Sequence, residues 1–258
     1  MFLKYLDLHN KILRDAEDPE KVAKELVANG YYVVGVNAHN SGEDVKNKEN
    51  YYKFFESHFE IFEKEGLLML PAVELKIRDG DYSKLPGLIS EFGRKYIPVH
   101  HKGKVHHVPF MVFIHGGNAD ANRVTCADSD SDLLCHPEKE GGVLTSQNAE
   151  DAAKNDVGIE VNYREYMFSD DKEAHKAQVL DTLGKVHFAG GKLFLFSATI
   201  HKEELTHIND LIEYGKLLHE DLIHTSLKNV HELVNKKYGA LLENIEFSID
   251  RMKERHRI

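Results

Sequence analysis

The sequence predicts an α/β fold formed by a single domain around a parallel sheet. Strand-like runs alternate with helical segments along all 258 residues, and no repeat or linker-like stretch divides them. Several of the runs are almost continuously apolar, as parallel strands are when both faces of the sheet are buried. The hydrophobic content of 41% is enough for a sizeable core. A closed barrel and a doubly wound open sheet both fit this pattern.

Seven runs are predicted to be strands, because β-branched and aromatic residues are enriched in them and turn residues bound them. In chain order they cover residues 2–9, 31–39, 67–74, 110–115, 132–136, 157–162 and 192–197. Between the third and the fourth run, an insertion rich in His and Lys near residues 98–109 shows no regular pattern, so we expect an irregular segment there.

The intervals between the strands show helical periodicity. The first helix has clear end signals, because Asp18 can cap it, Pro19 suits its first turn, and Asn29-Gly30 is a typical stop. The other expected helices cover residues 48–65, 82–94, 118–127, 145–154 and 171–189, and two more lie between 208 and 235 with a break near His224-Thr225.

Composition excludes several classes of protein. With 33 Lys and Arg against 43 Asp and Glu, the net charge is −10, which argues against a protein that binds DNA or RNA strongly by itself. No run of 18 apolar residues is present, so no membrane span is expected. The first residues lack the apolar core of a signal peptide. Cys126 and Cys135 have no CxxC partner, and we expect reduced, buried thiols in a cytoplasmic protein.

Positive charge is nevertheless concentrated in one stretch. No Asp or Glu occurs between Phe92 and Ala119, whereas this stretch contains Arg94, Lys95, Lys102 and Lys104. These four side chains are therefore candidates for contact with phosphate groups.

Five consecutive predicted strands end in a metal-ligating residue type. The five residues are His9, His39, Glu74, His115 and His136. In a parallel barrel the carboxyl ends of all strands open on one face, where imidazole and carboxylate groups would converge on a site suited to Zn, Mn or Fe. With 17 histidines in the chain, one or two such placements would also arise by chance.

A glycine pair follows the fourth strand. Gly116-Gly117 precedes a predicted helix, and the backbone amides at a helix N-terminus can bind an anion. The same pair also suits a tight strand-to-helix turn with no ligand. Arg123, one turn into that helix, could pack, pair with Asp120 or reach toward a phosphate.

The strand-end residues resemble the motifs of the polymerase-and-histidinol-phosphatase (PHP) superfamily. Asp7-Leu8-His9 resembles its first motif, although Lys11 stands at its second histidine. His39 retains the second motif with Ala38 in place of aspartate. Pro71-Ala72-Val73-Glu74 and Cys135-His136-Pro137 resemble two further motifs, whereas the aspartate of the last motif is absent near His201. The resemblance implies a distorted (β/α)7 barrel with a partly retained metal site, where Lys11 could contact phosphate.

A more specific resemblance covers nearly the whole chain. His115-Gly-Gly-Asn118, Asn122-Arg123 and Asp132-Leu-Leu-Cys-His136-Pro-Glu138 are similar to the archaeal ribonuclease P protein component 3 family, the thirty-kilodalton subunit family. It implies a subunit of the complex that matures the 5′ end of precursor tRNA. Its partners would be the ribonuclease P RNA and other protein subunits such as a component 2-like chain. The chemistry would then belong to RNA and Mg, and the histidines would remain from an ancestral metal site.

Two other functions stay open. The first is a metal-dependent phosphoesterase of the PHP superfamily, acting on a small phosphorylated substrate through His9, His39, Glu74, His115 and His136. The second is a non-enzymatic PHP-like protein that binds another protein. For the subunit, the expected RNA contacts are Arg94, Lys95, Lys102, Lys104 and Arg123.

Overall fold

The computed structural model describes residues 5–10, 17–40, 48–77, 80–139, 142–198 and 208–244. Within these ranges, the side chains of residues 5–10, 38–40, 48–50, 208 and 244 are not described.

All seven predicted strands are present, and they pair in chain order into one parallel sheet. They are β1 (Tyr5–Asn10), β2 (Tyr31–Asn40), β3 (Leu68–Leu75), β6 (Met111–His115), β7 (Leu133–Cys135), β8 (Gly158–Asn162) and β9 (Lys192–Phe196). A doubly wound sheet would reverse its strand order at a switch point. The sequential order observed here excludes that alternative.

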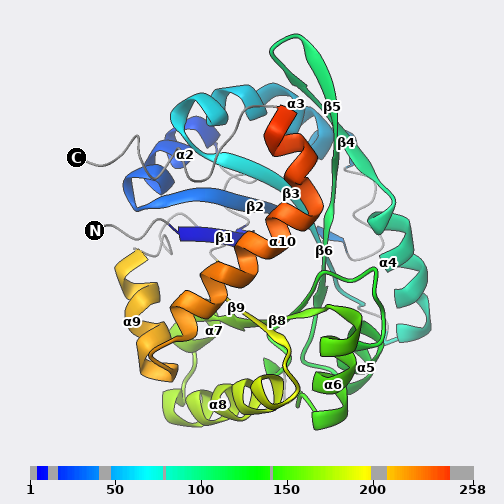
Figure 1. Cartoon of the computed structure of the whole chain (residues 1–258), viewed down its shortest axis with the longest axis vertical. Coiled ribbons are helices and arrows are strands. Elements are labelled where there is room, and N and C mark those ends of the chain that lie inside the picture. The colour runs from blue at the N-terminus through cyan, green and yellow to red at the C-terminus, as the bar shows by residue number, and fades with distance from the viewer. Residues whose placement is uncertain are drawn as a thin grey trace.

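Helices surround the sheet and join its strands (Figure 1). They are α2 (Pro19–Ala28), α3 (Lys48–Glu65), α4 (Leu85–Gly93), α5 (Ala119–Cys126), α6 (Ser146–Asn155), α7 (Tyr163–Met167), α8 (Lys172–Phe188), α9 (Ile208–Leu218) and α10 (Leu222–Asn244). The sheet curls so that β1 and β9 come into contact, although no ladder joins these two strands among the described residues. The result is a single-domain α/β fold with a curled, TIM-like parallel sheet.

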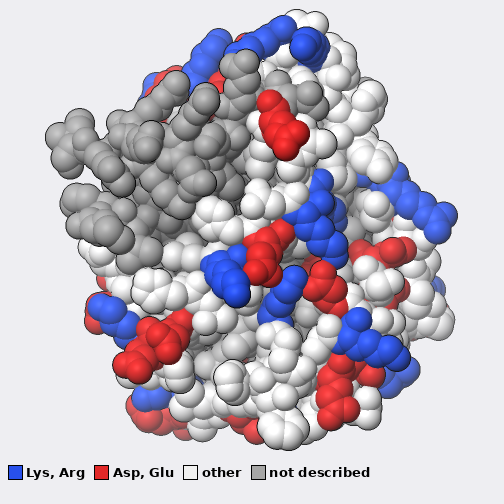
Figure 2. Space-filling model, viewed as in Figure 1, with Lys and Arg blue, Asp and Glu red and all other residues white. Residues whose placement is uncertain are grey.

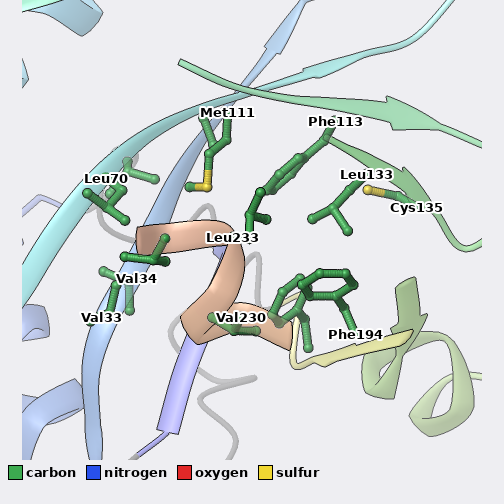
Figure 3. Close-up of a cluster of buried hydrophobic side chains, with 14 of the residues drawn as sticks. Val33, Val34, Leu70, Met111, Phe113, Leu133, Cys135, Phe194, Val230 and Leu233 are labelled. Atoms are coloured by element: carbon green, nitrogen blue, oxygen red, sulfur yellow. The ribbon is translucent and has the colours of Figure 1, made fainter. Parts of the chain in front are cut away.

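Helix α10 lies across the curled sheet and contributes to its apolar core. Figure 3 shows Val230 and Leu233 of α10 among side chains from several strands, including Phe113 and Phe194. These two phenylalanines and Val230 are almost completely buried. Such burial is the main favourable contribution to the stability of a domain.

Polar contacts hold α10 against the sheet, and two of them involve residues just before β6 and β7. Ser226 Oγ accepts a hydrogen bond of 2.8 Å from Leu195 N, and Asn229 Nδ2 donates one of 2.8 Å to Leu193 O. Tyr238 donates its hydroxyl proton to Pro109 O, 3.0 Å away and just before β6. Lys237 pairs with Asp132, just before β7. Lys237 and Tyr238 of α10 therefore lie at the amino ends of β7 and β6.

The expected helix break near His224-Thr225 is wrong. Helix α9 ends at Leu218, α10 begins at Leu222, and α10 then continues without interruption to Asn244. His224 and Thr225 are exposed on its surface, where weak helix formers have a small effect compared with the burial of the opposite face.

The insertion near residues 98–109 is regular, which corrects the second expectation. Strands β4 (Tyr96–His101) and β5 (Lys104–Pro109) form an antiparallel hairpin, with His101 opposite Lys104. The two residues between them, Lys102 and Gly103, have φ of 48° and 74°. Positive φ at both central positions is the mark of a type I′ turn. Residues of β4 alternate between exposed and buried, a pattern that its two adjacent histidines conceal in the sequence.

Two further expectations can be compared with the structure. Cys126 and Cys135 are both buried thiols, as the sequence predicts. Burial raises the pKa of the Cys126 thiol to about 12. No helix among the described residues has the length and apolar character needed to cross a lipid bilayer.

Candidate metal site at the carboxyl ends of the strands

Three of the predicted strand-end residues come together. Glu74 lies near the end of β3, His115 ends β6, and His136 directly follows β7. These strands are neighbours in the sheet, and all run in one direction. Parallel pairing therefore delivers the three side chains to one place. The metal-ligating atoms of the three residues lie within 4.8 Å of one another.

The three side chains are buried and in contact with one another. His115 Nδ1 lies 2.7 Å from Glu74 Oε1, and His136 Nε2 lies 3.4 Å from the same oxygen. The two imidazole rings meet edge to face with 4.4 Å between centroids. Glu74 has no solvent exposure. A buried carboxylate is stable only where partners compensate for its lost hydration, and the two histidines contribute to that here.

The backbone around His136 is held in an unusual conformation. Its φ is +34°, which is strained for a residue with a Cβ atom. Gly116 allows the His136 segment to approach, because a Cβ atom at Gly116 would lie 2.5 Å from Cys135 O. Asn122 Nδ2 donates a hydrogen bond of 3.0 Å to Pro137 O. The glycine turn and Asn122 thus position His136.

The Gly116-Gly117 turn serves packing and helix capping. A Cβ atom at Gly117, whose φ is +88°, would lie 2.4 Å from Lys139 O. The Asn118 side chain accepts hydrogen bonds from Asp120 N at 2.8 Å and Ala121 N at 3.4 Å. Asn118 therefore caps α5. These contacts support the tight-turn interpretation over an anion site.

Lys76 is a member of the site that the strand-end pattern does not predict. Its Nζ lies 3.0 Å from His115 Nε2, so His115 lies between the Glu74 carboxylate and the Lys76 ammonium group. Residues two apart in an extended chain point to the same side. The two-residue spacing of Glu74 and Lys76 was therefore the signal in the sequence that could have placed Lys76 at the site. Burial lowers the pKa of His115 to about 4, and the positive charge of Lys76 adds to this shift, against the opposing effect of Glu74.

A cleft of about 590 Å³ opens beside His115. Its lining residues come from the segments that follow β3 and β6, and they are Lys76, Ile77, Gly80, Tyr82, His115, Gly116, Asn118 and Asp120. Lys76 and His115 contribute both to the cleft and to the buried cluster. A small polar ligand in the cleft would therefore be able to contact these two side chains.

A second group of buried acids lies beside the first cluster. Glu138 and Glu160 are both almost fully buried, and Asn162 Nδ2 donates a hydrogen bond of 3.2 Å to Glu160 Oε1. Burial raises the pKa of Glu138 to about 8, and the carboxylates of Glu160 and Glu165 contribute to this shift. Glu138 is therefore largely protonated at neutral pH.

The aromatic residues next to these acids include a buried hydroxyl without a partner. Tyr166 and Tyr214 stack with 4.6 Å between ring centroids, and Tyr163 lies 5.3 Å from Tyr214. The Tyr214 hydroxyl has no hydrogen-bond partner among the described residues. Burial raises the pKa of Tyr214, and the charge of Glu138 adds to the effect.

The remaining predicted metal ligands are described only by their backbone. His9 lies in β1 and His39 lies in β2, where it is the register partner of Glu74. The carboxyl ends of these strands therefore lie at the same side of the sheet as Glu74. Lys11 is outside the described residues. For these three residues, the expected roles remain predictions.

The predicted phosphate-contact residues lie outside the buried cluster. Lys102 and Lys104 are exposed around the turn of the hairpin, which protrudes from the molecule at an end where Lys and Arg side chains gather (Figures 1 and 2). Arg94 is exposed next to α4, and Lys95 pairs with Glu91. Arg123 lies 3.4 Å from Asp120, so the ion pair, one of its three alternatives, is present. None of these contacts tests a role in RNA binding.

The donor set at Glu74, His115 and His136 fits a transition metal. One carboxylate and two imidazoles are the ligand types that Zn, Mn and Fe use in proteins. Their burial would exclude competing water. Both ring nitrogens of His115 already have polar neighbours, so a metal ion would have to replace one of them.

No protein-family model matches this sequence, and no curated protein matches it. Solved structures do resemble it. A chain from the cryo-electron microscopy structure of archaeal ribonuclease P with mature tRNA is 17% identical over 92% of this chain and 93% of its own length, with a TM-score of 0.67.

Two phosphatases also share the architecture. One is from the metal-dependent tyrosine phosphatases YwqE of Bacillus subtilis and CpsB of Streptococcus pneumoniae, at 14% identity, with 90% of this chain and 95% of that chain covered and a TM-score of 0.57. The other is histidinol phosphate phosphatase from Lactococcus lactis with Zn, L-histidinol and phosphate. It is 13% identical, with 84% of this chain and 93% of that chain covered and a TM-score of 0.52. At these identities the similarity shows a common fold.

Proposed function

We propose that this chain is a protein subunit of ribonuclease P that assists the 5′ maturation of precursor tRNA. The observation that carries the proposal is the similarity to a chain of archaeal ribonuclease P along nearly the full length of both, at a TM-score of 0.67. The motifs around His115, Asn122 and His136 resemble the thirty-kilodalton subunit family. In this function RNA and Mg carry out the cleavage, and the protein provides structure and contact surfaces.

The distribution of charge supports a limited, local contact with RNA. The net charge of −10 opposes non-specific attraction to phosphate, and Lys and Arg are interspersed with Asp and Glu on the face in Figure 2. The hairpin is different, because its exposed Lys102 and Lys104 lie in a stretch without any acidic residue. We therefore assign the RNA contact to the hairpin and Arg94, with Lys95 and Arg123 as flanking contacts. A component 2-like subunit would supply further affinity.

Reconstitution of precursor-tRNA cleavage tests the proposal. The chain, its cognate RNA and the other protein subunits are combined at low Mg, and the 5′ leader product is measured. We expect the chain to increase cleavage, and Lys102→Glu with Lys104→Glu to reduce that gain. The difference between this variant and the unchanged protein should shrink at high salt, since phosphate contacts weaken as salt rises.

A matched control separates local charge from total charge. Lys216→Glu with Lys228→Glu reverses two exposed lysines elsewhere and lowers the net charge by the same four units. This control should cleave like the unchanged protein. Equal loss in both double variants would reject the hairpin contact, and no gain from the unchanged chain would reject the subunit function.

The alternative is a metal-dependent phosphoesterase of the PHP type. The observation that favours it is the buried Glu74, His115 and His136 group, which adjoins a cleft of about 590 Å³. When bound there, Zn, Mn or Fe would polarise a phosphoryl oxygen and activate water. Glu74 and the histidines would hold the ion, with His9 and His39 as further ligands. Lys76 and Lys11 would stabilise negative charge on the phosphate.

Hydrolysis by the isolated chain tests the alternative. A chromogenic phosphomonoester is incubated with the protein and Zn, Mn or Fe, and the released product is measured. Rapid metal-dependent hydrolysis that His115→Ala abolishes would favour the phosphoesterase. Under the subunit proposal, hydrolysis stays at the background rate while reconstituted cleavage of precursor tRNA is enhanced.

A further inference from the structure

The imidazole of His115 bridges a carboxylate and an ammonium group. Lys76 Nζ lies 3.0 Å from Nε2 and Glu74 Oε1 lies 2.7 Å from Nδ1. An ammonium group has only protons to donate, so Nε2 must accept, and the ring proton must lie on Nδ1, which donates to Glu74. Neither ring nitrogen then offers a lone pair to a metal ion.

The same arrangement balances charge inside the protein. Glu74 has no solvent exposure and His115 is nearly buried, so the carboxylate needs a nearby positive charge. The Lys76 ammonium supplies it through the neutral imidazole. A divalent ion added to this cluster would lie near a cation, and like charges repel strongly where water is scarce.

We propose that Lys76 is a built-in cation that competes with divalent metal ions for the Glu74, His115 and His136 site. Binding of the metal ion and contact of Lys76 with His115 are in equilibrium, because Lys76 also lines the cleft and is only half-buried. Its side chain therefore has room to leave His115 when a metal ion binds. The inference concerns metal affinity, and it does not depend on which of the two functions is correct.

Zinc affinity tests this competition directly. Binding is measured by competition with a chromophoric chelator, and by the visible spectrum of bound Co²⁺. Lys76→Met keeps the length of the side chain and removes its charge, so we expect about tenfold or greater tightening at one ion per chain. Lys76→Arg retains a cation and should bind zinc as weakly as the unchanged protein. Lys216→Met, at an exposed lysine on α9, should also leave the affinity unchanged.

A further variant shows where the extra affinity arises. Adding His115→Ala to Lys76→Met should abolish the tightening and the Co²⁺ spectrum. Should Lys76→Met not fold, as judged by circular dichroism, Lys76→Gln is used with the same expectation. Equal zinc affinity in the unchanged and uncharged proteins would overturn the proposal. So would a gain that persists after His115→Ala.

Discussion

The amino and carboxyl ends of the strands in the curled sheet differ in the types of side chain that surround them. At the amino ends, α10 buries apolar side chains, and its polar groups have partners, such as Asn229 with Leu193 O. At the carboxyl ends, Glu74 and two histidines share a buried cluster, Tyr214 has a hydroxyl without a described partner, and His136 has a strained φ. Strain and poorly satisfied polar groups tend to persist where they serve function. The comparison indicates that α10 stabilises the fold and that the opposite end carries the site.

The largest loss of stability is expected when a large side chain is removed from the core that faces α10. Phe194 is 1% exposed, and its ring packs so closely on β8 that a Cβ atom at Gly158 would lie 2.2 Å from it. Phe194→Ala should lower the free energy of unfolding by about 3–5 kcal/mol through lost burial and a cavity. Urea denaturation measures this as a lower midpoint with an unchanged slope.

The same substitution at an exposed phenylalanine is the control. Phe188 ends α8 with 89% exposure, so Phe188→Ala should change the free energy of unfolding by less than about 0.5 kcal/mol. A comparable loss in both variants would show that general effects of removing an aromatic ring, rather than packing at α10, determine the result.

Two buried tyrosines allow the two ends of the sheet to be compared by the same substitution, tyrosine to phenylalanine. Tyr238 of α10 donates to Pro109 O at 3.0 Å. Tyr238→Phe should therefore cost about 0.5–1.5 kcal/mol, because it removes a hydrogen bond to a partly buried carbonyl. Thermal unfolding and urea denaturation both measure this loss.

Tyr214→Phe should behave in the opposite way. The hydroxyl it removes is buried without a described partner, so the free energy of unfolding should stay unchanged or rise by up to about 1 kcal/mol. If Tyr214→Phe destabilises the protein as much as Tyr238→Phe does, the carboxyl end is satisfied as fully as the amino end, and the comparison fails.

The smallest expected effect concerns a surface ion pair at the amino end. Asp156 precedes β8 and lies 2.8 Å from Lys192 and 2.7 Å from Lys236 of α10. Burial alone would raise the pKa of Asp156, but the two lysines outweigh it and lower the pKa. Asp156→Asn suits the left-handed φ of +60° at this position, a conformation that asparagine tolerates. Because the pair is partly exposed, the loss at neutral pH should be at most about 1 kcal/mol.

The pH dependence of the stability lost in Asp156→Asn follows from the direction of the pKa shift of Asp156. A carboxyl group with a lowered pKa in the folded state contributes stability above its unfolded pKa, about 4 for Asp. That contribution is lost as the pH falls through the folded value. The difference in stability between the unchanged protein and the Asp156→Asn variant should therefore shrink in acid and in high salt. A difference that is constant with pH would indicate a backbone effect instead.

Local signals in the sequence were sufficient for the site's main residues. Glu74, His115 and His136 each stand at the end of a predicted strand, and neighbouring parallel strands must bring such ends together. Lys76 was missed because it lies beyond the last residue of its predicted strand. Its contact with His115 joins positions 39 residues apart, and only the pairing of β3 with β6 creates it.

The sequence by itself determined the positions of the seven strands of the parallel sheet, the end signals of α2, and the end of the sheet at which Glu74, His115 and His136 lie. These features depend on periodicity and on residues close in the chain. Only the tertiary structure decided that β4 and β5 form a hairpin, that α10 packs against the sheet, and that Lys237 meets Asp132 across 105 residues. Such contacts depend on how buried surfaces fit together, and no local pattern specifies that fit.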